Sequence, residues 1–276
     1  MFKHINKTTL NKIFLILIII PMAFLMVMPY MWMITASLKE RGHVSEPPYL
    51  FPTTFDFSNY SKAWNGAPFG KYFLNTIFVA VVVVISRIFF GALAAYVFAF
   101  IKFKGCDSIY FIYLSTMMIP FYAIVIPLYL LIDDLNWLNT YQALIIPRMV
   151  DAFAIMILRQ SFISIPREYI DAANMDGSSH WHTLWKIVFP MCLPSVITSA
   201  VFSFLFIWND FFWPFLVAND TNLRVIQTGL QAFTGRYLTE WTYWMAGTVI
   251  ASLPPVLLFV FAQKYYISGL SRTGLK

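Results

Sequence analysis

Charged residues are scarce in this sequence. They make up 12 % of its 276 residues, against 59 % hydrophobic and 19 % aromatic residues. A water-soluble domain carries about 25 % charged residues, so this chain cannot cover a water-facing surface of its size. The composition excludes an ordinary soluble globular protein and indicates that lipid surrounds most of the surface.

Cysteine is also rare, and catalytic motifs are missing. Cys106 and Cys192 form no CxxC pair, so no metal or redox site is predicted. His180 and His182 are two residues apart and would face different directions on a helix. The sequence contains no phosphate-binding G-x-x-x-x-G-K-[ST] stretch, no HExxH motif and no nucleophile elbow. We therefore expect a protein that is not an enzyme, binds no cofactor and cannot itself hydrolyse ATP.

One explanation of the net charge of +6 is that the protein binds nucleic acid. However, the sequence lacks arrays of basic residues interleaved with aromatics on one loop. Lys and Arg residues instead sit between the apolar stretches, where they fit the ends of membrane helices. We expect no nucleic-acid partner.

Six apolar stretches are long enough to cross a bilayer, which takes about 20 helical residues. In chain order they are 13–38, 72–101, 108–132, 135–158, 187–209 and 241–263. The sequence therefore predicts an all-α integral membrane protein built as a bundle of six transmembrane helices.

The distribution of Lys and Arg indicates the orientation of these spans. Basic residues are more numerous in the segments that lie inside if both termini are cytoplasmic. The first apolar stretch is longer than the roughly 7 to 15 residues of a signal-peptide core, so we expect an uncleaved helix. The polar, proline-rich segment 39–71 then becomes an outer loop.

The segment between the fourth and fifth spans has the signals of a short helix followed by a turn and a second helical piece. Pro166 suits a first helical turn, with the acidic Glu168 favourable near its positive end. Ala172 and Ala173 are strong helix formers, and Gly177 permits a sharp turn after them. Spacing alone leaves two interpretations open: a docking element for a partner, or a plain connector packed under the bundle.

This segment resembles the EAA loop of type I ABC importer permeases. An acidic residue is followed by two alanines, a glycine four positions later and I-x-x-P. The matching residues are Asp171, Ala172, Ala173, Gly177, Ile187 and Pro190. The sequence departs from the family by having Asp171 for Glu and Phe189 for Leu. The resemblance implies a cytoplasmic coupling helix that docks onto an ATPase subunit through Glu168, Asp171, Ala172, Ala173, Asp176 and Gly177.

Other stretches resemble the carbohydrate branch of that family. The stretch 204–214 is similar to its fifth span, and 263–270 is similar to the end of the smaller maltose-permease-type subunit, although 271–276 depart from it. The resemblance implies an N-terminal helix and outer loop at 1–70, a type-1 core at 71–264 with the EAA loop at 166–190, and a cytoplasmic tail at 265–276.

The resemblance also implies the partners and the location. We expect a bacterial inner-membrane protein that pairs with a second related permease, above two cytoplasmic ATPases and below an extracytoplasmic solute-binding protein. ATP binding would close the ATPases, and the coupling helix would pass that closure to the spans. The pathway would then switch from inward-facing to outward-facing and accept a sugar from the binding protein.

Trp208, Asn209 and Asp210 are the candidates for contact with the sugar. Aromatic rings, amides and carboxylates are the groups that bind sugars, although the same cluster would also cap the fifth helix near the outer interface. A bulky residue at Ala173 or Gly177 is expected to uncouple transport.

Arg87, Arg148 and Asp151 are the charges inside the predicted spans. Arg148 and Asp151 are three apart, so on one helix they share a face and are expected to pair. An ion-gradient-driven secondary transporter would use such groups, and remains an alternative. A further alternative is an ABC importer permease for a non-sugar solute such as a glycerol phosphate ester.

Overall fold

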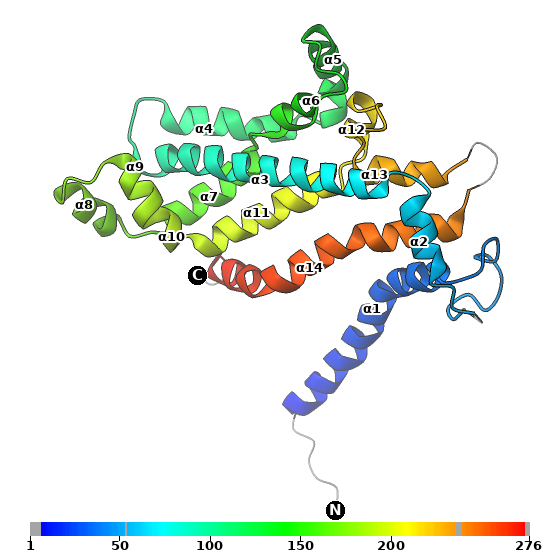
Figure 1. Ribbon diagram of the computed structural model, residues 1–276. Helices are drawn as coiled ribbons and strands as arrows, with labels where there is room; N and C mark the ends of the chain where they lie inside the picture. Colours follow the sequence, from blue (N-terminus) through cyan, green and yellow to red (C-terminus); the bar gives the residue numbers. More distant parts are fainter. Residues whose placement is uncertain (1–6, 53, 236–238, 274–276) are drawn as a thin grey trace, which may run out of the picture. The chain divides into compact units, whose positions relative to one another are not determined.

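The computed structural model describes residues 7–52, 54–235 and 239–273, with side chains described from residue 11 to residue 263 except Ile13 and the gaps. Within these ranges the chain is helical, and its β-structure is a single antiparallel bridge between Thr234 and Thr239 (Figure 1). The chain forms two compact units: Met1–Phe69 with Leu230–Ser252, and Gly70–Gly229 with Leu253–Lys276.

The helical elements follow one another with short connections. They are α1 (Lys7–Ser37), α2 (Ser58–Asn65), α3 (Phe69–Phe100), α4 (Cys106–Ser115), η1 (Thr116–Met118), α5 (Phe121–Asp134), α6 (Tyr141–Ile145), η2 (Ile146–Arg148), α7 (Ala152–Ile163), α8 (Arg167–Met175), α9 (His180–His182), η3 (Thr183–Val188), α10 (Phe189–Met191), α11 (Leu193–Trp208), α12 (Phe212–Val217), α13 (Ile226–Gly229), η4 (Leu230–Phe233) and α14 (Trp241–Thr273).

Four described helices are long and apolar enough to cross a membrane. They are Phe14–Ser37, Phe69–Phe100, Trp241–Gln263 and the stretch Tyr141–Ile163, which comprises α6, η2 and α7. Two bent pairs also qualify, namely Cys106–Met118 with Phe121–Asp134 and His180–Met191 with Leu193–Trp208. The prediction of an all-helical membrane protein is confirmed, and the six predicted spans are reached when each bent pair is one span.

The third predicted span, 108–132, is not one continuous helix. Its two halves meet at 95°. Pro120 offers no backbone N–H, and the residue before a proline is pushed out of the helical region. Ile119 is accordingly extended, with φ −81° and ψ 115°.

The boundaries of two other predicted spans also change. The fourth helix begins at Tyr141 and not at Leu135, because Asn136 and Asn139 adopt positive φ angles of 56° and 57° in a turn. The fifth predicted span, 187–209, is interrupted at Cys192, where the flanking helices meet at 84°. The predicted tail, 265–276, continues α14 to Thr273; its side chains and residues 274–276 lie outside the described part.

In the second unit, α3 runs through two apolar clusters. Around Val79, Ala80 and Val83 it packs with residues of α5, α6, α11 and α12. Around Ala92, Ala95 and Tyr96 it packs with residues of α7, α8, η3 and α11. The small residues of the second cluster allow close helix approach, as expected for membrane helices.

The first unit joins the end of α1 to the loop at 38–57 and the start of α14. The amide of buried Asn59 donates hydrogen bonds to the carbonyl oxygens of Ser37 and Lys39, at 3.0 and 2.9 Å. Arg41 pairs with Glu240 in a bidentate contact, and its Nε lies 2.8 Å from Glu240 Oε2. The loop is therefore fixed by hydrogen bonds to backbone groups and by charge pairs at the surface.

The segment after α9 is wound more widely than an α-helix. Thr183–Val188 forms a π-helix between α9 and α10. Such turns are rare and usually interrupt α-helices at functional positions. Here the π-helix lies between the predicted coupling segment and the bend at Cys192.

Candidate functional site: the α8 turn and the charged helix breaks

The α8 helix begins after Pro166, which has φ −56° and ψ 135° and thus stands just outside the helix. Glu168 lies in the first turn, where a negative charge is favourable because the backbone N–H groups point outward there. The helix runs for nine residues and lies beyond the ends of α3 and α7 in Figure 1. The predicted short helix is confirmed.

The end of α8 is closed by its own backbone. Gly177 has φ 74°, a conformation that L side chains rarely adopt. Its N–H donates to the carbonyl oxygen of Asn174 at 3.0 Å, and the N–H of Ser178 donates to that of Ala173 at 2.9 Å. This pair of bonds is the Schellman arrangement that ends many helices. The turn predicted at Gly177 is therefore present.

One stripe of α8 anchors it to the second unit. Ile170 and Ala173, three residues apart, are 7 % and 5 % exposed. Ile170 packs into the cluster that contains Leu158, Phe162 and Leu184. The helix is thus held by few apolar contacts along a single face, and the opposite face is left free.

The opposite face of α8 carries most of the predicted coupling residues. Glu168, Asp171, Ala172, Asp176 and Gly177 are all exposed. Ala173 differs, because its methyl group faces the protein's own interior. The predicted group of six therefore divides into five surface residues and one packing residue.

Two further exposed residues on α8 were missed in the sequence. Met175 is 88 % exposed and Tyr169 is 54 % exposed, although both carry large apolar surface. Met175 falls four residues after Asp171 and seven after Glu168, so helical periodicity places it on their face. That spacing was the signal that could have identified it.

The chain beyond the turn is tied to α3. The side chain of Ser179 accepts a hydrogen bond from the N–H of His182 at 3.3 Å and caps α9. The hydroxyl of Tyr96 lies 3.2 Å from Nδ1 of His180. These contacts connect the turn after α8 to a long helix of the second unit.

Trp208, Asn209 and Asp210 are adjacent in sequence but occupy three environments. Trp208 is 1 % exposed and its ring stacks on Phe204, with centroids 5.2 Å apart. Asn209 is exposed, and its amide donates to the carbonyl oxygen of Leu205 at 2.9 Å. Asp210 turns toward Arg148 and pairs with it. The three residues thus do not form one continuous surface.

The predicted pairing of Arg148 with Asp151 is wrong. Arg148 Nη2 lies 2.8 Å from Asp210 Oδ2, with both side chains largely buried. The helix is interrupted between the two predicted partners: Asp151 is extended, with φ −142° and ψ 127°. It caps α7 instead by accepting a hydrogen bond from the N–H of Ala154 at 3.0 Å. The prediction failed because it assumed one unbroken helix.

Arg87 completes this charged group. Its Nε donates to the carbonyl oxygen of Arg148 at 2.8 Å, and its Nη1 lies 3.8 Å from Asp151 Oδ2. The residue is 4 % exposed, so it needs these partners. Arg87, Arg148, Asp151 and Asp210 together are called the charged cluster below; two positive and two negative charges balance.

The charged cluster lies beside a cavity of only about 10 Å³, lined by Arg148, Asp210, Val79 and Trp213 among others. Sites for small ligands measure about 300 to 1,000 Å³. A sugar does not fit there in this conformation. The role of the charged cluster therefore lies in its contacts with the helices and not in binding a sugar in this conformation.

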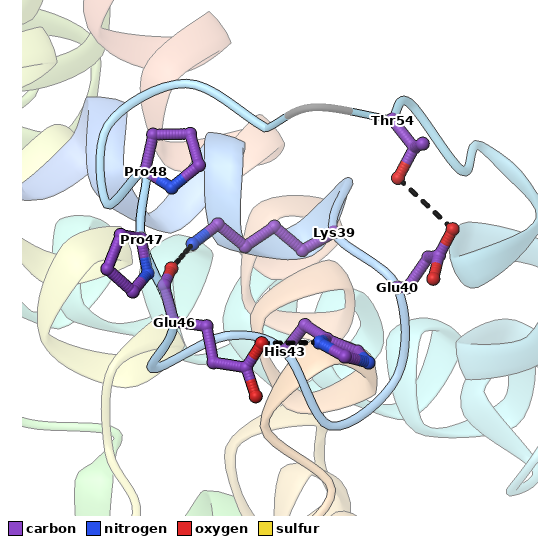
Figure 2. Close-up of a pocket in the computed structure, with 7 residues that line it drawn as sticks. All are labelled: Lys39, Glu40, His43, Glu46, Pro47, Pro48 and Thr54. Carbon is purple, nitrogen blue, oxygen red and sulfur yellow. Dashed lines mark hydrogen bonds and ion pairs between the residues drawn. The ribbon is translucent and has the colours of Figure 1, made fainter.

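A polar pocket of about 120 Å³ lies in the loop after α1, in the first unit (Figure 2). Figure 2 shows Lys39 reaching the carbonyl oxygen of Glu46, at 2.8 Å, and His43 facing the Glu46 carboxylate. The hydrogen bond from His43 Nδ1 to Glu46, at 2.7 Å, raises the pKa of His43. Because this pocket is also smaller than an ordinary ligand site, we assign it a structural role in the loop.

No group of three or more His, Cys, Asp or Glu side chains suited to a metal ion occurs in the part of the chain that the structure describes. His180 is hydrogen-bonded to the Tyr96 hydroxyl, and neither Cys106 nor Cys192 forms a disulfide.

Comparisons with known proteins agree with this architecture. Residues 87–272 match the family described as "Binding-protein-dependent transport system inner membrane component". The chain is 31 % identical over 275 residues to the "Probable ABC transporter permease protein YurM" of Bacillus subtilis (strain 168), covering 99 % of this chain and 90 % of the relative. It is 30 % identical over 258 residues to the "Arabinooligosaccharides transport system permease protein AraQ" of Halalkalibacterium halodurans, covering 92 % of each.

A solved structure shares the fold. It is described as the crystal structure of a bacterial ABC transporter involved in the import of the acidic polysaccharide alginate. The TM-score is 0.84 at 24 % identity, with 96 % of this chain and 99 % of that chain covered.

The family match spans more than half of the chain, so the chain belongs to the binding-protein-dependent transport system inner membrane components. It is a multi-pass ABC importer permease and is not an enzyme, because the permease subunits of this family are not catalytic.

Proposed function

We propose that this chain is a permease subunit of an ATP-driven carbohydrate importer, and that α8 with its Gly177 turn is where the ATPases are coupled. It would form half of the translocation pathway with a second related permease, receive sugar from a solute-binding protein and rest on two ATPases. Both termini and α8 would lie on the cytoplasmic side of the inner membrane.

The observation that carries the coupling role is the two-sided character of α8. One face is anchored by Ile170 and Ala173, while the face with Glu168, Ala172 and Met175 is exposed. Met175, at 88 % exposure, places a flexible apolar side chain in the middle of a polar segment. A water-facing helix gains nothing from such a residue, whereas a protein partner can bury it.

The carbohydrate assignment rests on relatives. The relative from Halalkalibacterium halodurans is named for arabinooligosaccharides, and the solved transporter for alginate. Sequence identities near 30 % support the substrate class and do not fix the particular sugar.

Photocrosslinking from α8 tests the coupling role. A benzophenone amino acid at Met175, in complexes purified from the native membrane, is expected to crosslink to the ATPase subunit. The same probe at Phe57 is the control, because that residue is 68 % exposed but lies in the predicted outer loop. Crosslinks to the ATPase from Phe57, or none from Met175, would contradict the proposal.

Bulky substitutions separate docking from folding. Ala172→Trp enlarges the exposed face and is expected to reduce uptake at least tenfold while the complex still assembles. Asn174→Trp, on the flank of α8, is the matched control and should retain most uptake. Ala173→Trp is less informative, because that side chain also packs inside the protein. Gly177→Trp strains the turn through its positive φ angle.

Uptake of a defined panel tests the substrate class. Cells with and without this gene are compared for uptake of labelled arabinotriose, diacetylchitobiose, maltotriose and sn-glycerol 3-phosphate. Loss of uptake of one of the sugars supports the proposal. Loss confined to the phosphate ester would replace it with the alternative of a non-sugar importer. Sugar uptake that survives ATP depletion and stops with an uncoupler would indicate a secondary transporter.

A further inference from the structure

Three helix interruptions of the second unit meet at the charged cluster. α5 starts at Phe121 after the 95° bend, α7 starts at Ala152 after η2, and α12 follows α11 after the interruption at Asn209–Phe211. The guanidinium carbon of Arg148 lies 4.5 Å from the ring centre of Phe121 and 5.3 Å from that of Phe206. Arg148 thus contacts α5 and α11 while it pairs with Asp210 at the third interruption.

The interruptions before α7 and after α11 leave backbone groups that no helix satisfies, and the charged cluster supplies partners for some of these groups. Arg87 donates to the carbonyl oxygen of Arg148, at the end of η2. Asp151 accepts from the N–H of Ala154, and Asp210 accepts from that of Trp213 at 3.4 Å. Unsatisfied backbone groups are costly inside a membrane, so the interruptions depend on these side chains.

Stability alone does not explain why four charges are used. A buried ion pair roughly breaks even against apolar residues of the same volume, because desolvation cancels most of the attraction. What a buried pair does offer is a contact with two discrete states, closed or separated. Ionisable groups inside membrane spans are costly and are functional candidates for that reason, and discontinuous helices form the central sites around which transporters rock.

We propose that the Arg148–Asp210 pair is a latch: it holds the α11–α12 interruption against the start of α7 and opens during the transport cycle. Arg148 is then a positioning residue, which acts through Asp210 on the segment that follows Trp208 and Asn209. This inference rests on the proposed function, because it requires a chain that alternates between conformations.

The cavity beside the latch provides a reporter. Val79 lines it together with Arg148 and Asp210 and is 4 % exposed, so a thiol at this position is shielded while the latch is closed. The reporter chain carries Val79→Cys with Cys106→Ser and Cys192→Ala, assembled with its partners in lipid nanodiscs. The measured quantity is the rate of reaction with N-ethylmaleimide.

Four chains form a double-mutant cycle on this reporter: the parent, Arg148→Gln, Asp210→Asn and the double variant. Each single variant is expected to label at least fivefold faster than the parent. The double variant is expected to label within twofold of the faster single variant, because both changes remove the same contact. Single variants within twofold of the parent, or effects that multiply in the double variant, would overturn the latch.

Arg159→Gln is the matched control. Like Arg148, Arg159 contacts an aromatic ring and a carboxylate: its guanidinium carbon lies 4.0 Å from the ring centre of Tyr110, and its Nη2 lies 3.5 Å from Asp107 Oδ1. Its Nε also donates a hydrogen bond to the backbone carbonyl oxygen of Phe98. Arg159 lies on α7, but these three partners are outside the charged cluster, so the variant should leave labelling within twofold of the parent. Faster labelling equal to that of Arg148→Gln would show a general loosening and would overturn the proposal.

ATP turnover distinguishes a latch from a static brace. Addition of MgATP to the parent reporter is expected to raise the labelling rate at least threefold, and labelling unchanged by turnover would overturn the opening step. If Arg148→Gln does not assemble, the isosteric Asp210→Asn and the turnover measurement still decide. None of these measurements needs the substrate. They can fail while α8 still crosslinks to an ATPase, so failure of the latch is distinguishable from failure of the proposed function.

Discussion

Helices of this chain are interrupted both at the exposed end of α8 and among the buried side chains before α7 and after α11. The backbone groups left unpaired at these places are satisfied in two different ways. After α8 the turn is closed by backbone bonds at Gly177 and Ser178, without charged side chains. At the interruptions before α7 and after α11, Arg87, Asp151 and Asp210 take up the free backbone groups. Water can satisfy a backbone group that a turn leaves open, but lipid cannot. The comparison teaches that charges in this protein matter most where water is excluded.

The largest effect is expected when one partner of the buried Arg148–Asp210 pair is removed. Arg148→Leu leaves Asp210 buried without its cation and is expected to cost about 3 to 5 kcal/mol in the free energy of unfolding. Arg148→Leu with Asp210→Leu should recover most of that loss. Pulse proteolysis of the purified complex in detergent measures both. A single variant as stable as the parent would show that the charges are dispensable.

An intermediate effect is expected at the turn after α8. Gly177→Ala should cost about 1 to 2 kcal/mol, because the left-handed conformation is unfavourable for a residue with a Cβ atom. No atom lies within 4 Å of the added carbon, so the cost is conformational and not steric. Gly177→Asn should cost less, since Asn tolerates this region.

Hydrogen exchange at the Ser178 amide measures this change locally. Gly105→Ala is the control, because Gly105 also has a positive φ, 88°, and open space around it. It should destabilise its own loop and leave exchange at Ser178 unchanged. Equal exchange in the parent and Gly177→Ala would show that the turn does not depend on glycine.

The smallest effect is expected for an exposed charge pair in the loop after α1. The pKa of His43 is raised by its hydrogen bond to Glu46, so the protonated form favours the folded loop. This contribution is fully present below the ordinary pKa of about 6.5 and is lost as the pH rises through the raised value. The melting temperature of His43→Gln should therefore fall slightly below that of the parent at about pH 6, and the difference should vanish by about pH 9. A difference that grows with pH would give the opposite sign and contradict this assignment.

Hydropathy predicted the spans because lipid imposes one simple requirement, a long apolar helix with few charges. It could not predict where those helices are interrupted. Pro120 signalled one interruption, and Asp151 is a favoured capping residue before an apolar run, but inside a long apolar stretch both were included in continuous spans.

The candidate site shows the same limit. The local pattern from Pro166 to Gly177 was sufficient for α8, because helix, stop and turn all depend on neighbours in sequence. The partner of Arg148 lies 62 residues away. Only the packing of α11 against η2 and α7 brings Asp210 to it, and no local pattern carries that information. Ala173 was likewise assigned to the partner's side because sequence does not say which face of a short helix is buried.

The π-helix at Thr183–Val188 has a consequence for chain length. A wide turn of this kind contains one residue more than an α-helical turn. Side chains downstream of Val188 are therefore rotated by about 100° from where an unbroken α-helix starting at His180 would direct them. A related permease that lacks one residue in this stretch can form a regular α-helix here and still connect the positions of Ser179 and Cys192. An alignment of such a relative with this chain therefore needs a one-residue gap within these six residues, and the segments on both sides then align without a shift.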